Sequence, residues 1–281
     1  NCMMIRYFFR VALLLAIMPL AYCDDNANDK PEDIIAETEE PKPSIEQSKF
    51  NAQNVFNSLP DHKVVLKLIE DNKIEYNPDI LNDPNFVSKY STEFSKGINL
   101  GIYGSDLNIA SSFDQTQESM VFLKCVNMLA SNLGVSSAFD QKMFERIEAN
   151  STHKDSVLEI VTNAFKKVDE ILKYNNRPAT SAIILSGCWI EGLFVSCKIA
   201  EEGNHESIIK TIIAQKESLR NLIIMIKSVN LEEKDKFIIE DMDDLYKAFE
   251  VAETTKKYNL KSLSEISRKI ALIRSKITAV S

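Results

Sequence analysis

The stretch from Pro178 to Ala200 constrains the fold more than any other part of the chain, because it is almost continuously apolar. At about 1.5 Å per residue it would form a helix roughly 35 Å long. Pro178 suits the first helical turn, and Gly203 suits a C-terminal stop. Apolar side chains fall on nearly every face of this helix. The sequence therefore predicts that other helices surround it.

The same stretch is also long enough to span a bilayer. Glu191 lies near its middle and Lys198 near its end, and charged residues inside a membrane span are costly and rare. We therefore expect a buried core helix and not a membrane anchor.

The remainder of the chain also has a helical pattern. Glycine and proline are scarce, at 7 and 8 of 281 residues, and apolar residues recur at helical spacing. The connections are short, which favours antiparallel neighbours. We expect an all-α fold, a multi-helix, mostly antiparallel bundle around 178–200. The other expected helices are 44–59, 61–72, 91–112, 114–133, 136–149, 152–174, 205–229, 231–257 and 262–279.

The first residues are typical of a secretory leader. Arg6 and Arg10 precede a short apolar run over 11–20, which is the layout of a signal peptide. Asn1 is not an ordinary start, so we expect the initiator to be Met3 or Met4.

The segment Leu20-Ala21-Tyr22-Cys23 resembles the processing box of bacterial lipoproteins, in which the cysteine after the cleavage site carries lipid. Tyr22 departs from that pattern, since a small residue is usual there. We predict lipidation at Cys23 and attachment to a membrane through the N-terminal lipid. The alternative is plain secretion with cleavage after Cys23.

Charge divides the chain into three parts. Residues 24–43 carry eight acids and two lysines, which predicts a disordered acidic tether over 24–44. A sorting signal in the same segment is a compatible alternative. We expect residues 1–23 to be the signal and 45–281 to be a single all-helical domain. No basic patch indicates nucleic acid as a partner.

Glycines mark two of the expected helices. Gly97, Gly101 and Gly104 share one face of the 91–112 helix, and Gly187 and Gly192 lie in the central helix. A glycine inside a helix costs roughly 0.5–1 kcal/mol relative to alanine. We therefore predict that these two helices approach each other closely.

The same two helices each carry a narrow polar seam. Asn99, Tyr103 and Asp106 share one face of the 91–112 helix, and Thr180, Gly187, Glu191 and Lys198 line up along the central helix. A pocket formed by Asn99, Tyr103, Asp106, Trp189 and Glu191 would bind a small polar ligand or a cation, and paired carboxylates are also suited to acid–base chemistry. The alternative that we favour is that these groups satisfy one another, as buried polar groups must.

The remaining candidates for chemistry are weak. The histidines His62, His153 and His205 lack the spacing of a metal site, so we expect no metal and no cofactor. Of the cysteines in expected helices (Cys125, Cys188 and Cys197), the first could form a disulfide with one of the others, but three free thiols are favoured.

Three segments carry a family resemblance: Asn99-Leu-Gly-Ile-Tyr-Gly-Ser-Asp106, Phe113-Asp-Gln-Thr-Gln117 and Gly187-Cys-Trp-Ile-Glu-Gly192. They resemble an uncharacterised family of all-helical lipoproteins from Bacteroidota-type bacteria. The similarity covers most of residues 54–202. It implies an envelope location and an all-α fold, and it supplies no catalytic residue.

Together these features predict a lipoprotein of the cell envelope that is anchored at the outer membrane, on its periplasmic or its surface face. We expect a binding or assembly component rather than an enzyme, with a protein partner or a small ligand in addition to the membrane. The alternative is a secreted helical protein that binds a small polar ligand near Asp106 and Glu191.

Overall fold

The computed structural model describes residues 53–55, 58, 62–150 and 153–280. All of these lie in one of the two units into which the chain divides, Pro41–Ser281. The expected leader and tether, with Cys23, lie outside the described residues, as does most of the helix expected over 44–59. The three-part division of the chain therefore stays a prediction.

The all-α fold is confirmed, and the described residues contain no strand. Four short 3₁₀ turns join the longer helices, among them η1 (Pro78–Ile80) and η2 (Pro84–Lys89). The α-helices are α2 (His62–Asp71), α3 (Glu93–Ser112), α4 (Thr116–Asn132), α5 (Gln141–Ala149), α6 (Lys154–Tyr174), α7 (Pro178–Gly203), α8 (Glu206–Ile213), α9 (Lys216–Lys227), α10 (Phe237–Thr255) and α11 (Leu260–Thr278).

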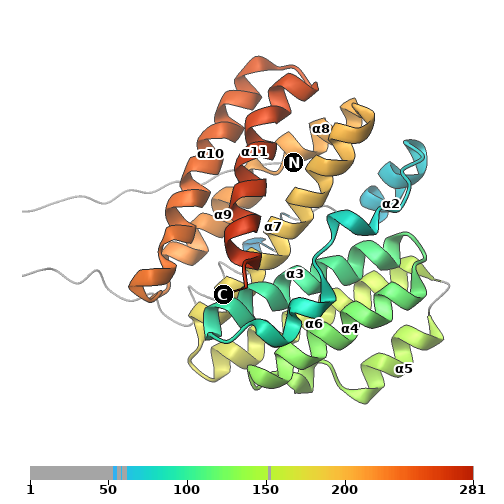
Figure 1. The fold of residues 1–281 in the computed structure, drawn as a ribbon, viewed down its shortest axis with the longest axis vertical. Helices are drawn as coiled ribbons and strands as arrows, with labels where there is room; N and C mark the ends of the chain where they lie inside the picture. The colour runs from blue at the N-terminus through green and yellow to red at the C-terminus, as the bar shows by residue number, and fades with distance from the viewer. Residues whose placement is uncertain (1–52, 56–57, 59–61, 151–152, 281) are drawn as a thin grey trace, which may run out of the picture. The chain divides into compact units, whose positions relative to one another are not determined.

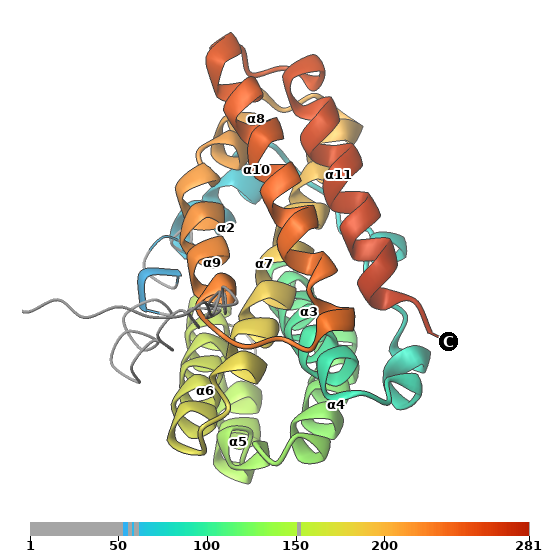
Figure 2. The same ribbon diagram turned by 90° about the vertical axis from the view of Figure 1, so that its left-hand side faces the viewer.

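The helix α7 is the centre of this bundle. It packs against α3, α6, α8, α9 and α11, and no residue from Pro178 to Ala200 is exposed. Figures 1 and 2 show α3 and α7 between the group α4–α6 and the group α8–α11. Among the described residues α7 is the one helix long and apolar enough to cross a membrane, but 72% of its most apolar window is buried inside the protein. The prediction of a core helix is therefore confirmed.

Consecutive helices run antiparallel where their side chains pair. Lys216, at the start of α9, pairs with Glu253 near the end of α10, and Lys227, at the end of α9, pairs with Asp243 earlier in α10. The antiparallel direction follows from these two pairs, which place the start of α9 beside the end of α10 and the end of α9 beside its earlier part.

The central pair, α3 and α7, runs parallel instead. Gly97 faces Ile183 early in both helices, and Ser105 faces Gly192 a little more than two turns later in each. Three helices separate α3 from α7 in the sequence, so the chain has the length to return to its starting end. The prediction of close packing between these helices is confirmed, and the parallel direction follows from the register of their contacts.

Two glycines bring the α3 and α7 backbones into direct contact. A Cβ on Gly101 would overlap the carbonyl oxygen of Ile184 and lie 2.6 Å from the amide nitrogen of Cys188. A Cβ on Gly187 would overlap the carbonyl oxygen of Ile98 and lie 3.3 Å from the Cα of Gly101. Side chains are therefore excluded from this contact, and only glycine fits at either position.

Two of the other glycines in α3 and α7 have different surroundings. A Cβ on Gly104 would overlap the ring of Phe165, which belongs to α6. A Cβ on Gly192 would lie 3.7 Å from the Oγ of Ser105, which is an ordinary contact distance. Only Gly101 and Gly187 thus require backbone contact between α3 and α7.

The prediction of one helix over 205–229 is wrong. The helix breaks after Ile213, and the amide of Gln215 donates to the carbonyl of Ile212 in a tight turn before α9 begins. Asn204 does not cap this region from its N-terminal side. It adopts a left-handed conformation (φ 50°) that ends α7, a role for which asparagine is one of the few suitable residues.

We expect alanine substitutions at these glycines to change the free energy of unfolding by different amounts, according to what each new Cβ would contact. Gly101→Ala and Gly187→Ala place a methyl group against backbone atoms that cannot rotate away, so each should lower the free energy of unfolding by at least about 2 kcal/mol. Gly192→Ala is the matched control. It meets no close atom and should be neutral or stabilising by up to about 1 kcal/mol. Urea unfolding followed by circular dichroism measures the free energy of unfolding of all three variants. Equal effects at the three positions would contradict the conclusion that only Gly101 and Gly187 make backbone contact.

Candidate functional site

The carboxyl groups of Asp106 and Glu191 meet in the core between α3 and α7. Both residues are fully buried. The parallel register explains the meeting, because Ser105 faces Gly192 and the carboxylates occupy the adjacent positions of the two helices. The predicted juxtaposition of these two acids is therefore present.

A third ionisable group, Arg274 of α11, completes this buried cluster. Its Nε donates to one carboxylate oxygen of Glu191 at 2.7 Å, and its Nη2 donates to the other at 2.8 Å. The guanidinium also lies over the ring of Phe194, 4.3 Å from its centroid. A bidentate pair of this kind fixes both partners in orientation as well as in charge.

The irregular segment before α3 closes the cluster from the outside. The amide nitrogen of Asn82 donates to Oδ2 of Asp106 at 3.2 Å. The carbonyl of Ile80 accepts a second hydrogen bond from Nη2 of Arg274 at 3.3 Å. The turns η1 and η2 are thus tied to the middle of the bundle through backbone groups that no side-chain pattern reveals.

The cluster is electrically neutral when Asp106 holds a proton. Burial, and then the negative charge of Glu191, raise the pKa of the Asp106 carboxyl well above its ordinary value. Burial also raises the pKa of Glu191, but the hydrogen bonds and charge of Arg274 oppose that shift. Oδ1 of Asp106 is buried and has no hydrogen-bond partner. The directions of the two shifts favour a proton held by the Asp106–Glu191 pair, and Arg274 balances the one remaining negative charge.

Two other predicted site residues bind neighbouring backbone. The amide of Asn99 donates to the carbonyl of Ile277 at 2.9 Å, which satisfies one of the open carbonyl groups at the end of α11. The hydroxyl of Tyr103 donates to the carbonyl of Asp83 at 2.8 Å. Both side chains therefore fasten other segments to α3.

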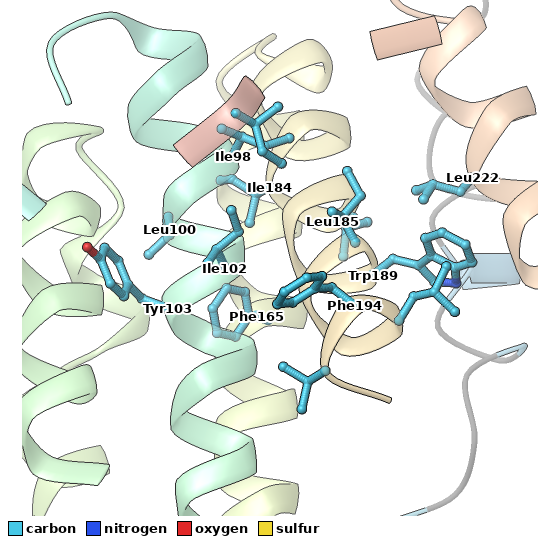
Figure 3. Close-up of a cluster of buried hydrophobic side chains, with 14 of the residues drawn as sticks. Ile98, Leu100, Ile102, Tyr103, Phe165, Ile184, Leu185, Trp189, Phe194 and Leu222 are labelled. Atoms are coloured by element: carbon cyan, nitrogen blue, oxygen red, sulfur yellow. The ribbon is translucent and has the colours of Figure 1, made fainter. Parts of the chain in front are cut away.

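Trp189 lies away from the other predicted site residues. Figure 3 shows Tyr103 pointing away from α7, while Trp189 extends from the opposite side of the pair toward Leu222 of α9. The indole nitrogen of Trp189 donates to the Oγ of Ser218 at 3.1 Å. The structure therefore does not join Trp189 to the carboxylates in one site.

The cluster leaves little room for a polar ligand. Neither Asp106 nor Glu191 lines any of four cavities on the described part of the chain, which border Trp189, Arg177, Ser119 and His153 respectively. The same part of the chain contains no group of three histidine, cysteine or acidic residues that could hold a metal ion. The thiols of Cys125, Cys188 and Cys197 are free, as we expected. The ligand-binding role assigned to the five candidates stays a prediction.

Arg274 is the member of the cluster that the sequence analysis missed. The signal was present, because Ile266, Ile270 and Ile277 of α11 are buried and Arg274 falls on the same face. A charged residue within an apolar helix face indicates a buried partner. The partner itself, Glu191, is 83 residues away in the sequence.

No family model, curated protein or solved structure matches this chain. By its fold, the protein is an all-α bundle that is built on a parallel pair of helices and contains a buried ion cluster, which is neutral when Asp106 holds a proton. The resemblance to the Bacteroidota-type lipoproteins stays a prediction.

We expect Arg274 to be essential for stability. Arg274→Met leaves Glu191 buried without its partner, so it should lower the free energy of unfolding by about 3–5 kcal/mol. Arg268→Met on the same helix is the matched control. It removes an ion pair with Glu265 that is mostly exposed, and it should cost no more than about 1 kcal/mol. Comparable losses in the two variants, measured by urea unfolding, would show that the buried pair has no special role.

The proton on Asp106 should be visible in the pH dependence of stability. A raised pKa in the folded state contributes stability below the unfolded pKa, and this contribution is lost as pH rises toward the folded value. Asp106→Asn keeps a donor for Glu191 and does not titrate. The variant should therefore gain stability relative to the wild type as pH rises above about 4, by up to about 1.4 kcal/mol per pH unit. A difference that stays constant between pH 4 and 8 would contradict a protonated Asp106.

Proposed function

We propose that this chain is a non-enzymatic binding or assembly component of the cell envelope, held at the outer membrane through a lipidated Cys23. The leader over 1–23 and the lipoprotein-like box at its end support export and anchoring. The acidic segment 24–44 would then separate the helical body from the membrane surface as an extended tether. The resemblance to helical lipoproteins agrees with this location.

The enclosed state of the carboxylate pair is the observation that carries the non-enzymatic part of the proposal. A general acid or base must come within hydrogen-bond reach of its substrate. Both Asp106 and Glu191 are fully buried, and Arg274 occupies the two oxygens of Glu191. The contacts of these two buried acids are thus made with other groups of the protein, which supports a non-enzymatic role.

The alternative, a secreted protein that binds a small polar ligand near Asp106 and Glu191, has weaker support. The cation that such a ligand would supply is already present as the guanidinium of Arg274. A ligand would have to displace this bidentate pair and reach Asp106 past the segment that contains Ile80 and Asn82.

The anchoring half of the proposal is tested by the partition of the full-length protein. Cys23→Ala removes the residue that would carry lipid, so the protein should move from the membrane fraction to the soluble fraction when it is expressed in a Gram-negative host. Cys125→Ala is the matched control, because it changes a buried thiol of the helical body, and it should remain with the membrane. Partition that is unchanged by Cys23→Ala would overturn the lipid anchor.

A further inference from the structure

A cavity of about 240 Å³ lies between α2, α3, α7 and α8, apart from the buried ion cluster. Each of the four helices contributes apolar side chains to it, including Leu68, Ile109, Val195 and Ile212. Trp189 forms part of the α7 wall. No charged side chain lines this cavity.

The polar side chains in the wall are mostly satisfied by their own helices. The hydroxyls of Ser112, Ser196 and Thr211 each donate to the carbonyl four residues earlier, at 2.8, 2.7 and 3.0 Å. The indole nitrogen of Trp189 is engaged by Ser218. These hydroxyl and indole donors are therefore already used within the protein.

The thiol of Cys188 adds to this apolar character. Burial raises the pKa of Cys188 to about 12, so the side chain stays protonated at neutral pH and behaves as a small apolar group. Cys188 is nevertheless partly accessible, and it lines the cavity. Cys188 therefore adds a small apolar surface to the cavity wall.

A cavity with such a wall favours an apolar occupant over water. The cavity is partly open at the protein surface, but its wall offers few of the two to four polar partners that an ordered water needs, and an enclosed apolar cavity of about 150 Å³ binds benzene. The present cavity is larger by more than half, which corresponds to roughly eight to ten non-hydrogen atoms. The wall is mainly aliphatic, and the amide of Gln215 supplies one polar group.

We propose that this cavity is a binding site for a neutral alkyl chain of about eight carbons that carries a single polar end group. The chain lies among the aliphatic side chains of α2, α7 and α8, and the polar end lies at Gln215. This inference goes beyond the envelope function proposed above and does not depend on Cys23, so each can fail without the other.

The single tryptophan of the chain makes the proposal directly measurable. Because Trp189 is the only indole in the protein and lines the cavity, an occupant should change its fluorescence. Titration of the full-length protein with 1-octanol should give a saturable change with one site per chain, confirmed by isothermal calorimetry. A linear, non-saturating response would overturn the proposal.

Variants locate the binding. Ser196→Phe fills the cavity from the α7 wall and should weaken octanol binding at least tenfold. Val251→Phe adds the same ring at a position of α10 that is 66% exposed and should leave binding unchanged. If Ser196→Phe does not fold, Thr211→Phe tests the opposite wall in the same way. Binding that survives a folded, cavity-filling variant would place the octanol elsewhere and overturn the site.

A second ligand tests the polarity of the wall. The diol 1,8-octanediol has the same chain length, but its second hydroxyl would enter the cavity where the wall hydroxyls are already bonded. It should bind at least tenfold more weakly than 1-octanol, because a buried hydroxyl without a partner is costly. Equal affinity for the two ligands would contradict an apolar cavity.

Discussion

The direct contact between the backbones of α3 and α7 is the constraint on which the rest of this structure depends. Gly101 and Gly187 face each other, and neither position has space for a Cβ. Glycine lowers the intrinsic stability of a helix, but here it allows two long apolar helices to pack along their backbones. The contact also fixes their register, so that every residue on the facing surfaces of α3 and α7 has a determined neighbour.

The buried ion cluster is a consequence of that register. Asp106 and Glu191 are brought together by α3 and α7, and Arg274 binds the resulting negative charge from α11. A buried ion pair adds little net stability relative to apolar packing, but it penalises any arrangement in which a partner is missing. The cluster therefore favours one packing position for α11, in which Arg274 reaches Glu191. The hydrogen bonds of Asn82 and Ile80 to the cluster hold the segment before α3 in place in the same way.

Features carried by local pattern could be predicted from the sequence, and features set by distant partners could not. The largely apolar run of α7 predicted a surrounded helix, and the glycines predicted close approach to α3. The turn at Gln215 has no proline or glycine to mark it, so the periodic pattern continued through it. The partner of Glu191 could not be predicted, because a pair of residues 83 positions apart leaves no local pattern in the sequence. The cavity could not be predicted either, because it depends on how the side chains of four helices pack together.

Native-state hydrogen exchange tests the central role of the α3–α7 contact most directly. If these two helices form the most stable part of the fold, their amides near Gly101 and Gly187 should exchange last, with an opening free energy equal to that of global unfolding. The amides of α2 and α5 should exchange earlier through local opening. Slowest exchange in another pair of helices, with α3 and α7 opening separately at lower free energy, would contradict the account.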